Sequence, residues 1–254
     1  MPTILVVGAT GQQGGGVINA LLASGSTDLK IRALTRNPAS SAAQALSKRG
    51  IEPVKGDLLD RQSLAKALTG CDAAYLVTDF RGPEDIDGEL KQGRQFVDAA
   101  AEADGVVDTP TPPPPGVKHV VFSSVAGADQ TAGIVDHFHT KHLVEQHIQA
   151  SKIPYWTVVR PVGFMEVFPP PGALARFFFW GAFAALMGDT KQKYVACDDI
   201  GRAVAKALLE PKRFHGRILT PGSPEETRAL LGEVMDIETW ARRKQAEREA
   251  RNSK

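Results

Sequence analysis

The stretch VVGATGQQGGG at residues 6–16 constrains the fold of this chain more than any other part of the sequence. Five of its eleven residues are glycine, and it overlaps the end of the apolar run TILVV. Glycine loses more backbone entropy on folding than other residues, so such a cluster indicates a place where side chains are sterically excluded. The stretch therefore predicts a tight turn after a first strand, where another group approaches the backbone closely.

The residues after this turn alternate between strand-like and helix-like segments. The apolar runs lie at residues 3–7, 30–36, 51–57, 73–79, 119–125 and 155–161, and the helix-like stretches lie at 17–24, 40–49, 60–68, 89–103 and 138–151. This alternation is typical of βαβ units, which build one parallel sheet with helices on both faces. We therefore expect an α/β protein with a doubly wound parallel sheet.

A proline-rich insert at residues 108–116 interrupts the alternation. It lies in a connection between a helix and a strand, where roughly 2–6 residues are usual, and the sequence around it is DGVVDTPTPPPPGVK. Proline has no N–H for helix or sheet pairing, so we expect an exposed polyproline-type loop. A docking site for a proline-reading partner is the alternative interpretation.

The part of the chain after Pro161 is less regular. We expect a helix at residues 198–209, capped by Asp198 or Asp199 and ended by Pro211, and a strand in the run RILTP. In the charged end of the chain, Trp240 and its neighbours are expected to anchor one helical turn, followed by a solvated, fraying tail. The predicted organisation is a nucleotide-binding domain at 1–161 and a small C-terminal lobe at 162–254 that roofs the ligand crevice.

Composition and charge exclude several classes of function. The 254 residues are 43% hydrophobic, and 30 basic against 29 acidic residues leave a net charge of +1. We therefore do not expect a chain so balanced to bind nucleic acid by charge. Cys71 and Cys197 form no C-x-x-C pair, which suits a reducing compartment, and the start MPTILVV is expected to be a strand and not a signal peptide. We therefore expect a cytoplasmic protein.

The aromatic segment FFFWGAFAALMG at residues 177–188 resembles part of a membrane span. It is twelve residues long, whereas a helix needs about 20 to cross a bilayer. We expect a buried or pocket-lining helix and no membrane span. A contact with a membrane surface or another subunit is the alternative.

The first glycines of the turn have the spacing of a dinucleotide site. Gly8, Gly11 and Gly14 form G-x-x-G-x-x-G between the first strand and the first helix. A turn without side chains lets a pyrophosphate approach backbone N–H groups and the positive end of the helix. The sequence therefore predicts a dinucleotide site, and it assigns no role to Gly15 or Gly16.

The end of the second strand indicates which dinucleotide is bound. In ALTRNP, Arg36 stands where an acidic residue would hold a free ribose 2′-hydroxyl, which favours the 2′-phosphate of NADP(H) over NAD(H). A surface salt bridge is the alternative role for Arg36. In KGDL, Asp57 and Leu58 are expected beside adenine, although Asp57 could instead cap the next helix.

Seven motifs, in this order and spacing, resemble the NmrA-like group of atypical short-chain dehydrogenases/reductases over about residues 3–209. They are GATGQQG, LTRNP, KGDLLD, YLVTDF, VFSSV, HFHTKHLVEQHI and VVRPVGFMEVF. The resemblance implies a Rossmann fold that prefers NADP(H). Around the phosphates it implies Gly8, Thr10, Gly11, Gln12, Gln13 and Gly14.

The same resemblance implies the rest of the cofactor site. Arg36 would hold the 2′-phosphate, and Asp57 and Leu58 would flank adenine. The nicotinamide and its ribose would be surrounded by Thr78, Lys141 and the loop from Pro161 to Phe164. The group includes both reductases and proteins that sense the NADPH/NADP ratio.

The catalytic pattern of ordinary short-chain dehydrogenases is incomplete here. Those enzymes carry Tyr-x-x-x-Lys, and this chain has His137 in place of the tyrosine while Lys141 remains. Lys141 could act as acid or base, or only bind cofactor. Ser124 and His137 are weaker candidates for catalysis. The other histidines of this helix lack a completing carboxylate or cysteine, so we expect no metal site.

Two hypotheses of function follow. One is an NADPH-dependent oxidoreductase that reduces a small apolar carbonyl or conjugated compound, with Lys141 as the polar group nearest the acceptor. The other is a non-catalytic NADPH/NADP sensor with a regulatory protein partner. The absent tyrosine favours the sensor, as does a lobe that looks trimmed between RILTP and Trp240. In a separate departure from the family, Ser40 stands where some relatives have a second phosphate-binding lysine, so we expect a reduced affinity for the 2′-phosphate.

Overall fold

The structure is a computed structural model that describes residues 1–81, 84–102, 116–131, 134–168, 192–222, 224–232 and 235–252. The proline-rich insert, apart from Gly116, and the aromatic segment at 177–188 lie outside the described residues. Among the residues that are described, no helix is long and apolar enough to cross a membrane.

The chain alternates strands and helices as predicted. The range 1–161 contains β1 (Thr3–Val6), α1 (Gln12–Ala23), β2 (Lys30–Thr35), α2 (Ser41–Ser47), β3 (Glu52–Lys55), α3 (Arg61–Leu68), β4 (Ala73–Val77), α4 (Asp85–Ala101), β5 (His119–Ser123), α5 (Asp136–Ala150) and β6 (Tyr155–Val159). The later elements are β7 (Gly163–Phe164), the 3-10 helix η1 (Met165–Val167), β8 (Tyr194–Val195), α7 (Cys197–Leu209), α8 (Pro211–Phe214), β9 (Arg217–Leu219), α9 (Pro224–Leu231) and α10 (Ile237–Asn252).

A parallel sheet forms the centre of the molecule. Its strands follow the order β3-β2-β1-β4-β5-β6-β9, and each neighbouring pair is parallel. This confirms the predicted α/β doubly wound fold. The strand order reverses between β1 and β4, and open sheets of this kind bind ligands at the carboxyl ends of the strands beside that reversal.

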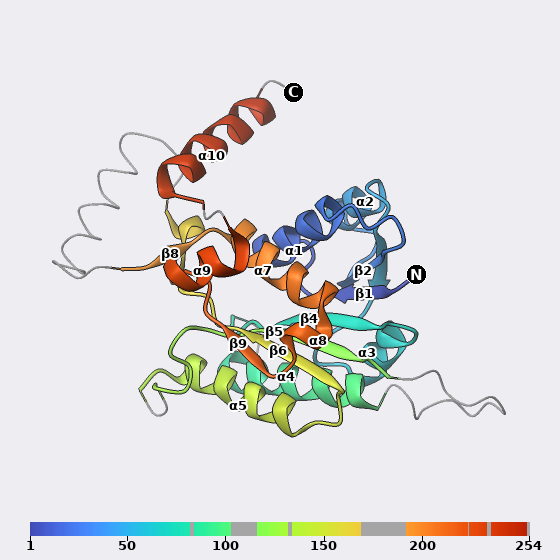
Figure 1. The fold of residues 1–254 in the computed structure, drawn as a ribbon. Coiled ribbons are helices and arrows are strands. Elements are labelled where there is room, and N and C mark those ends of the chain that lie inside the picture. The colour runs from blue at the N-terminus through green and yellow to red at the C-terminus, as the bar shows by residue number, and fades with distance from the viewer. Residues whose placement is uncertain are drawn as a thin grey trace.

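Helices cover both faces of the sheet (Figure 1), with α1 and α7 on one face and α4 and α5 on the other. Successive strand residues point to opposite faces, so Ile4 and Val6 join the core under α1 and α7 while Leu5 joins the core under α4 and α5. Tyr75 and Phe122 are divided between the two cores in the same way. Burial on both faces explains why these strands are almost continuously apolar.

The range 162–254 contributes to these layers as well. Strand β9 pairs with β6 at the edge of the sheet, and α7 packs along α1. The strand predicted in RILTP is therefore confirmed as β9. The division at 161 and the roofing role of the later residues stay predictions.

Helix α7 begins differently from the prediction. It starts at Cys197 after Ala196, and Ala196 makes no side-chain cap hydrogen bond. The predicted caps Asp198 and Asp199 lie inside the first turn. The carboxylate of Glu166 accepts the Cys197 N–H at 3.1 Å instead, so the cap comes from η1.

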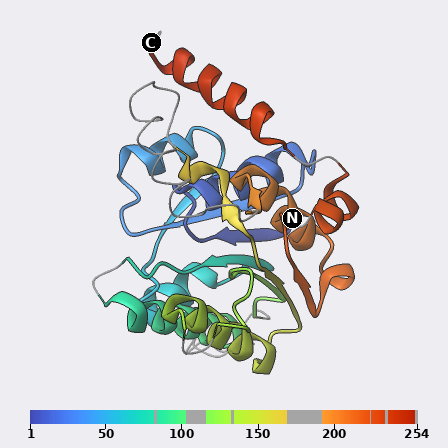
Figure 2. The same cartoon turned by 90° about the vertical axis from the view of Figure 1, so that its left-hand side faces the viewer.

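The charged end of the chain forms helix α10, which extends away from the body in both views (Figures 1 and 2). The predicted fraying after one turn is wrong, because charges of both signs pair along the helix. Lys244 lies 3.0 Å from Glu247, and Arg243 reaches Asp198 of α7 at 2.8 Å. Trp240 is buried at the base of the helix, as its anchoring role requires.

The helices α1 and α7 touch through glycine. A Cβ atom on Gly16 would lie 2.6 Å from the Cys197 carbonyl oxygen, and one on Gly201 would lie 2.2 Å from the Gly16 carbonyl carbon. Both distances are far below a van der Waals contact, so neither position has room for a side chain. Gly16, to which the sequence assigned no role, thus lets the two helix backbones meet.

Gly16→Ala should therefore lower the free energy of unfolding by about 1–3 kcal/mol, as overpacking does, although alanine favours helix. Gly15→Ala is the matched control, because its Cβ would meet only the Ala9 carbonyl oxygen at 3.9 Å. Urea unfolding of the two variants measures the difference. Equal free energies of unfolding for the two variants would show that the close contact of α1 with α7 does not exclude a side chain at residue 16.

A buried histidine predicts how stability depends on pH. His119 is almost fully buried, and its Nε2 lies 3.0 Å from Thr157 Oγ1, which itself donates to the Phe214 carbonyl. Burial lowers the pKa of His119 to about 4, with a smaller effect of His215. Below the ordinary histidine pKa the unfolded chain then binds more protons than the folded chain, so stability falls as the pH drops from 6.5 to 4.

His119→Gln, which keeps an N–H donor but cannot titrate, should flatten this dependence. Between pH 7 and pH 4, the free energy of unfolding of the wild-type protein should fall by on the order of 3 kcal/mol more than that of the variant. Urea unfolding at several pH values gives the slopes. Parallel slopes for the two proteins would contradict the neutral state of His119.

Candidate functional site

The glycine turn after β1 leaves the start of α1 open. Gly8 has φ +65°, a left-handed conformation that favours glycine, and its carbonyl accepts the Gly11 N–H at 2.8 Å. A Cβ on Gly14 would lie 2.2 Å from the Gly8 carbonyl oxygen. Helix α1 has no side-chain cap and no acidic residue in its first turn. Its first N–H groups and its positive end are thus suited to an anion.

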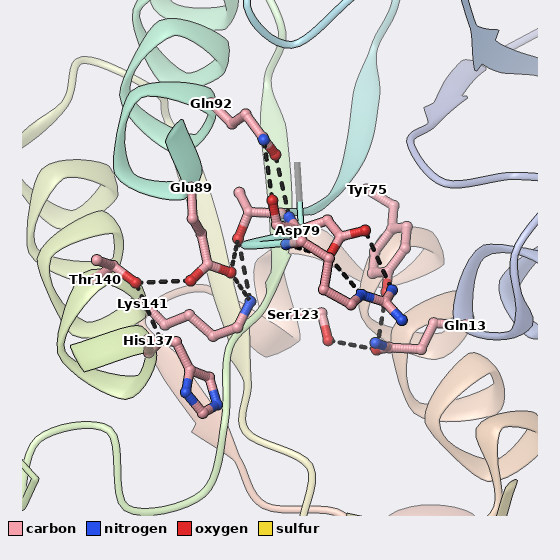
Figure 3. A network of polar contacts seen from close by, with 11 residues as sticks. Gln13, Tyr75, Asp79, Glu89, Gln92, Ser123, His137, Thr140 and Lys141 are labelled. Atoms are coloured by element: carbon pink, nitrogen blue, oxygen red, sulfur yellow. Dashed lines mark hydrogen bonds and ion pairs between the residues drawn. The ribbon is translucent and has the colours of Figure 1, made fainter. Parts of the chain in front are cut away.

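The side chain of Gln13 turns away from that role. Its Oε1 accepts hydrogen bonds from Ser123 Oγ at 2.7 Å and from the Tyr75 hydroxyl at 3.3 Å (Figure 3). The side chain therefore ties the start of α1 to β4 and β5, and a phosphate contact of Gln13 would fall to its backbone N–H. Thr10 on the turn and Gln12 at the start of α1 are both exposed.

Arg36 directly follows β2 and is exposed. Within the part of the chain that the structure describes, it makes no hydrogen bond or ion pair. Arg32, earlier in the same strand, pairs instead with Glu52 at 3.3 Å. The alternative role of Arg36 in a surface salt bridge finds no partner there. Ser40 caps α2 by accepting the Ala43 N–H at 3.3 Å.

Asp57 and Leu58 follow β3 and are half-buried. The carboxylate of Asp57 accepts the Leu59 N–H at 2.9 Å and so shapes this loop. The cap of α3 is Asp60, which accepts the Gln62 N–H at 3.0 Å. The alternative reading of Asp57 as that cap is therefore wrong, because Asp60 occupies the position directly before the helix.

Lys141 on α5 reaches the end of β4 and meets a buried carboxylate (Figure 3). Its Nζ lies 3.0 Å from Glu89 Oε1 of α4 and donates to Thr78 Oγ1 at 3.1 Å. The Glu89 side chain is fully buried, and that of Lys141 is 11% exposed. Thr78 and Lys141, both expected near the nicotinamide, are thus in contact, and the acid that joins them was not predicted.

The two weaker catalytic candidates both precede Lys141 in the chain. Ser124 is buried, and in the described residues its Oγ has no hydrogen-bond partner. The ring of His137 packs against Phe80 with centroids 4.8 Å apart, and Figure 3 shows it turned away from the Lys141 ammonium. His137 therefore takes the place of the tyrosine in sequence without joining the Lys141 cluster.

The loop after β6 supplies the last predicted residues. Pro161 is buried, and its carbonyl accepts the Ala126 N–H at 3.0 Å. Phe164 lies in β7, which pairs with β8. Glu166, just beyond, also accepts the Trp240 indole N–H at 3.2 Å. This loop is thereby held to both α7 and α10.

The predicted site residues come together at one edge of the sheet. Those after β1 to β6 all follow the carboxyl ends of parallel strands, and Lys141 reaches this edge from α5. In the described ranges, no group of three or more potential metal ligands is present. Glu89 and Gln92 were missed, although both interrupt the apolar face of α4 that carries Phe96 and Ala100. A polar side chain on such a face is the signal that could have found them.

The NmrA-like family profile matches residues 1–228. The chain belongs to the NmrA-like family. Among curated members, the NmrA-like family domain-containing oxidoreductase malD from Malbranchea aurantiaca is 30% identical over 238 residues, which cover 84% of this chain and 65% of malD. FrzB from Cladobotryum sp. is 30% identical over 239 residues, which cover 85% of this chain and 67% of FrzB. The chain thus spans about two thirds of the length of these NmrA-like oxidoreductases.

Solved structures share the fold of this NmrA-like chain. Triphenylmethane reductase of Citrobacter sp., complexed with NADP(H), superimposes with a TM-score of 0.75 at 18% identity, covering 95% of this chain and 99% of the reductase. NmrA, a negative transcriptional regulator in complex with NADP, gives a TM-score of 0.73 at 18% identity, covering 98% of this chain and 97% of NmrA. An NADPH-dependent quinone oxidoreductase from Escherichia coli, complexed with NADPH, gives a TM-score of 0.64 at 26% identity, covering 85% of this chain and 67% of that enzyme.

Proposed function

We propose that this chain binds NADP(H) at the carboxyl edge of its sheet and is an NADPH-dependent oxidoreductase that reduces a small apolar carbonyl or conjugated compound. The observation that carries the proposal is the Lys141 ammonium, held beside Thr78 by the buried Glu89 at this edge. The curated relatives of similar sequence are named oxidoreductases, and the neighbouring structures contain NADP(H).

The residues present fit the dinucleotide. The uncapped start of α1 offers N–H groups to a pyrophosphate across a turn where Gly8 is left-handed and Gly14 has no room for a side chain. Arg36, free of other partners in the described chain, can bind a 2′-phosphate with two parallel hydrogen bonds. Asp57 and Leu58 follow the neighbouring strand, where adenine would lie.

The chemistry at the other end depends on Lys141. NADPH, when bound, supplies a hydride. An ammonium has three N–H groups, and Glu89 and Thr78 accept two of them. Within the described residues the third has no hydrogen-bond acceptor, so it can donate to the oxygen of a substrate or of the ribose. A fixed N–H donor of this kind can stabilise negative charge that develops on a carbonyl oxygen through its hydrogen bond.

A non-catalytic sensor of the NADPH/NADP ratio is the second candidate. The observation that favours it is His137, whose ring packs against Phe80 and leaves no hydroxyl in the tyrosine position. The fold also matches that of NmrA, which is a transcriptional regulator. A sensor would act through a regulatory protein partner and would turn over no substrate.

Cofactor choice depends on Arg36 in both candidates. Arg36→Ala should weaken NADPH binding about tenfold or more and leave NADH binding nearly unchanged, because the guanidinium meets only the 2′-phosphate. Calorimetry with both cofactors measures the two affinities, and Arg49→Ala is the control for loss of an exposed arginine elsewhere. Equal losses for NADPH and NADH would remove Arg36 from the 2′-phosphate.

Turnover separates the oxidoreductase from the sensor. NADPH absorbance should decay with at least one of a panel of aldehydes, quinones and enones, and Lys141→Met should lower kcat about 100-fold or more, beyond its effect on NADPH affinity. Turnover that Lys141→Met leaves unchanged would contradict the role of Lys141. No turnover, together with a several-fold preference for one redox form, would establish the sensor.

A further inference from the structure

Glu89 is a carboxylate in the apolar face of α4. Its side chain is fully buried, and its neighbours on that face include Gly93, Phe96 and Val97. Removing a carboxylate from water is costly unless charge and hydrogen bonds compensate for the lost hydration. An apolar residue would occupy this position at less cost. The contacts that hold the Glu89 carboxylate therefore indicate what it does there.

Both oxygens of Glu89 are used, and the partners come from two other elements (Figure 3). Oε1 accepts from Thr78 Oγ1 at 3.0 Å and lies 3.0 Å from Lys141 Nζ. Oε2 accepts from Thr140 Oγ1 at 2.7 Å. Thr140 and Lys141 are consecutive on α5. The carboxylate therefore holds the helix residue next to Lys141 as well as the ammonium at the end of the Lys141 side chain.

A second residue on the same face of α4 fixes the neighbouring loop. Gln92 accepts the Asp79 N–H and donates to the Asp79 carbonyl, both at 3.1 Å. Thr78 and Asp79 are consecutive at the end of β4. One turn of α4 thus sets the position of this strand end and of the Lys141 ammonium relative to each other.

We propose that Glu89 is a positioning residue that orders the Lys141 ammonium before NADPH binds. The inference rests on the proposed function, since it assigns Lys141 a contact with the cofactor or substrate. A free lysine side chain loses much rotamer entropy when a ligand fixes it. With Glu89 in place, folding has already fixed the side chain, so binding does not carry that cost.

Glu89→Gln keeps the size of the side chain but removes the charge that holds Lys141. The variant should bind NADPH about tenfold more weakly, which is the entropy of ordering one lysine side chain expressed as an affinity. Glu89→Asp, which keeps the charge, should recover part of the loss. Calorimetry gives these affinities without any need for turnover.

A double-mutant cycle tests whether Glu89 acts through Lys141. In a Lys141→Met background, Glu89→Gln should cost no further NADPH affinity, because no ammonium remains to be ordered. The double variant should also unfold at a higher temperature than Lys141→Met alone, since it leaves no unpaired buried carboxylate. An equal loss of NADPH affinity in both backgrounds would overturn the inference, as would tighter binding by Glu89→Gln.

Glu145→Gln is the matched control. Glu145 is likewise a buried glutamate in a helix, and it is paired with Arg160 at 2.6 Å. Its substitution should lower the unfolding temperature, as Glu89→Gln does, but leave NADPH affinity within about twofold. If the wild-type chain binds no NADPH, the proposed function fails. If it binds NADPH and the cycle is additive, only the role of Glu89 fails.

Discussion

The contact between the backbones of α1 and α7 sets much of the arrangement around the site. Because Gly16 and Gly201 both lack side chains, the two helices lie close enough for α7 to start beside the glycine turn. The first N–H of α7 is then within reach of Glu166, and that carboxylate also holds Trp240 of α10. The contact between Gly16 and Gly201 thus links the glycine turn, the loop after β6 and the last helix.

Two buried carboxylates join α5 to its neighbours. Glu89 crosses from α4 to Lys141, and Glu145 on α5 accepts two hydrogen bonds from Arg160 at the end of β6. Such pairs add little net stability, since desolvation offsets much of the attraction, but each fixes the orientation of the two side chains that it joins. The two pairs differ in whether the cation can still bind another group. Arg160 is also paired with Asp129, whereas Lys141 keeps one N–H without an acceptor in the described residues.

The sequence predicted the features that local patterns encode. The apolar runs identified β1 to β6, and the spacing of Gly8, Gly11 and Gly14 identified the turn that leaves α1 uncapped. The start of α1 was predicted too late, at residue 17, because the helix begins at Gln12 among glycines of low helix propensity, where tertiary contact with the turn overrides propensity. Glu89 was missed because Thr140 and Lys141 lie 51 and 52 residues further along the chain and meet it only when α4 packs on α5. The role of Gly16 was missed for the same reason, since its contacts Cys197 and Gly201 on α7 lie 181 and 185 residues further along the chain.

The pairing of Lys141 bears on the choice between oxidoreductase and sensor. A sensor must bind one redox form more tightly, and the two forms differ by one positive charge on the nicotinamide. If Lys141 lies near that ring, as the family resemblance implies, an unpaired ammonium there would favour the reduced form by repelling that charge. Glu89 lies 3.0 Å from the ammonium and largely cancels its field, so the pair discriminates little between the two forms. The N–H that remains keeps its ability to donate to a nearby oxygen. A site that retains the donor but neutralises the charge is better suited to assisting hydride transfer than to reporting the redox ratio.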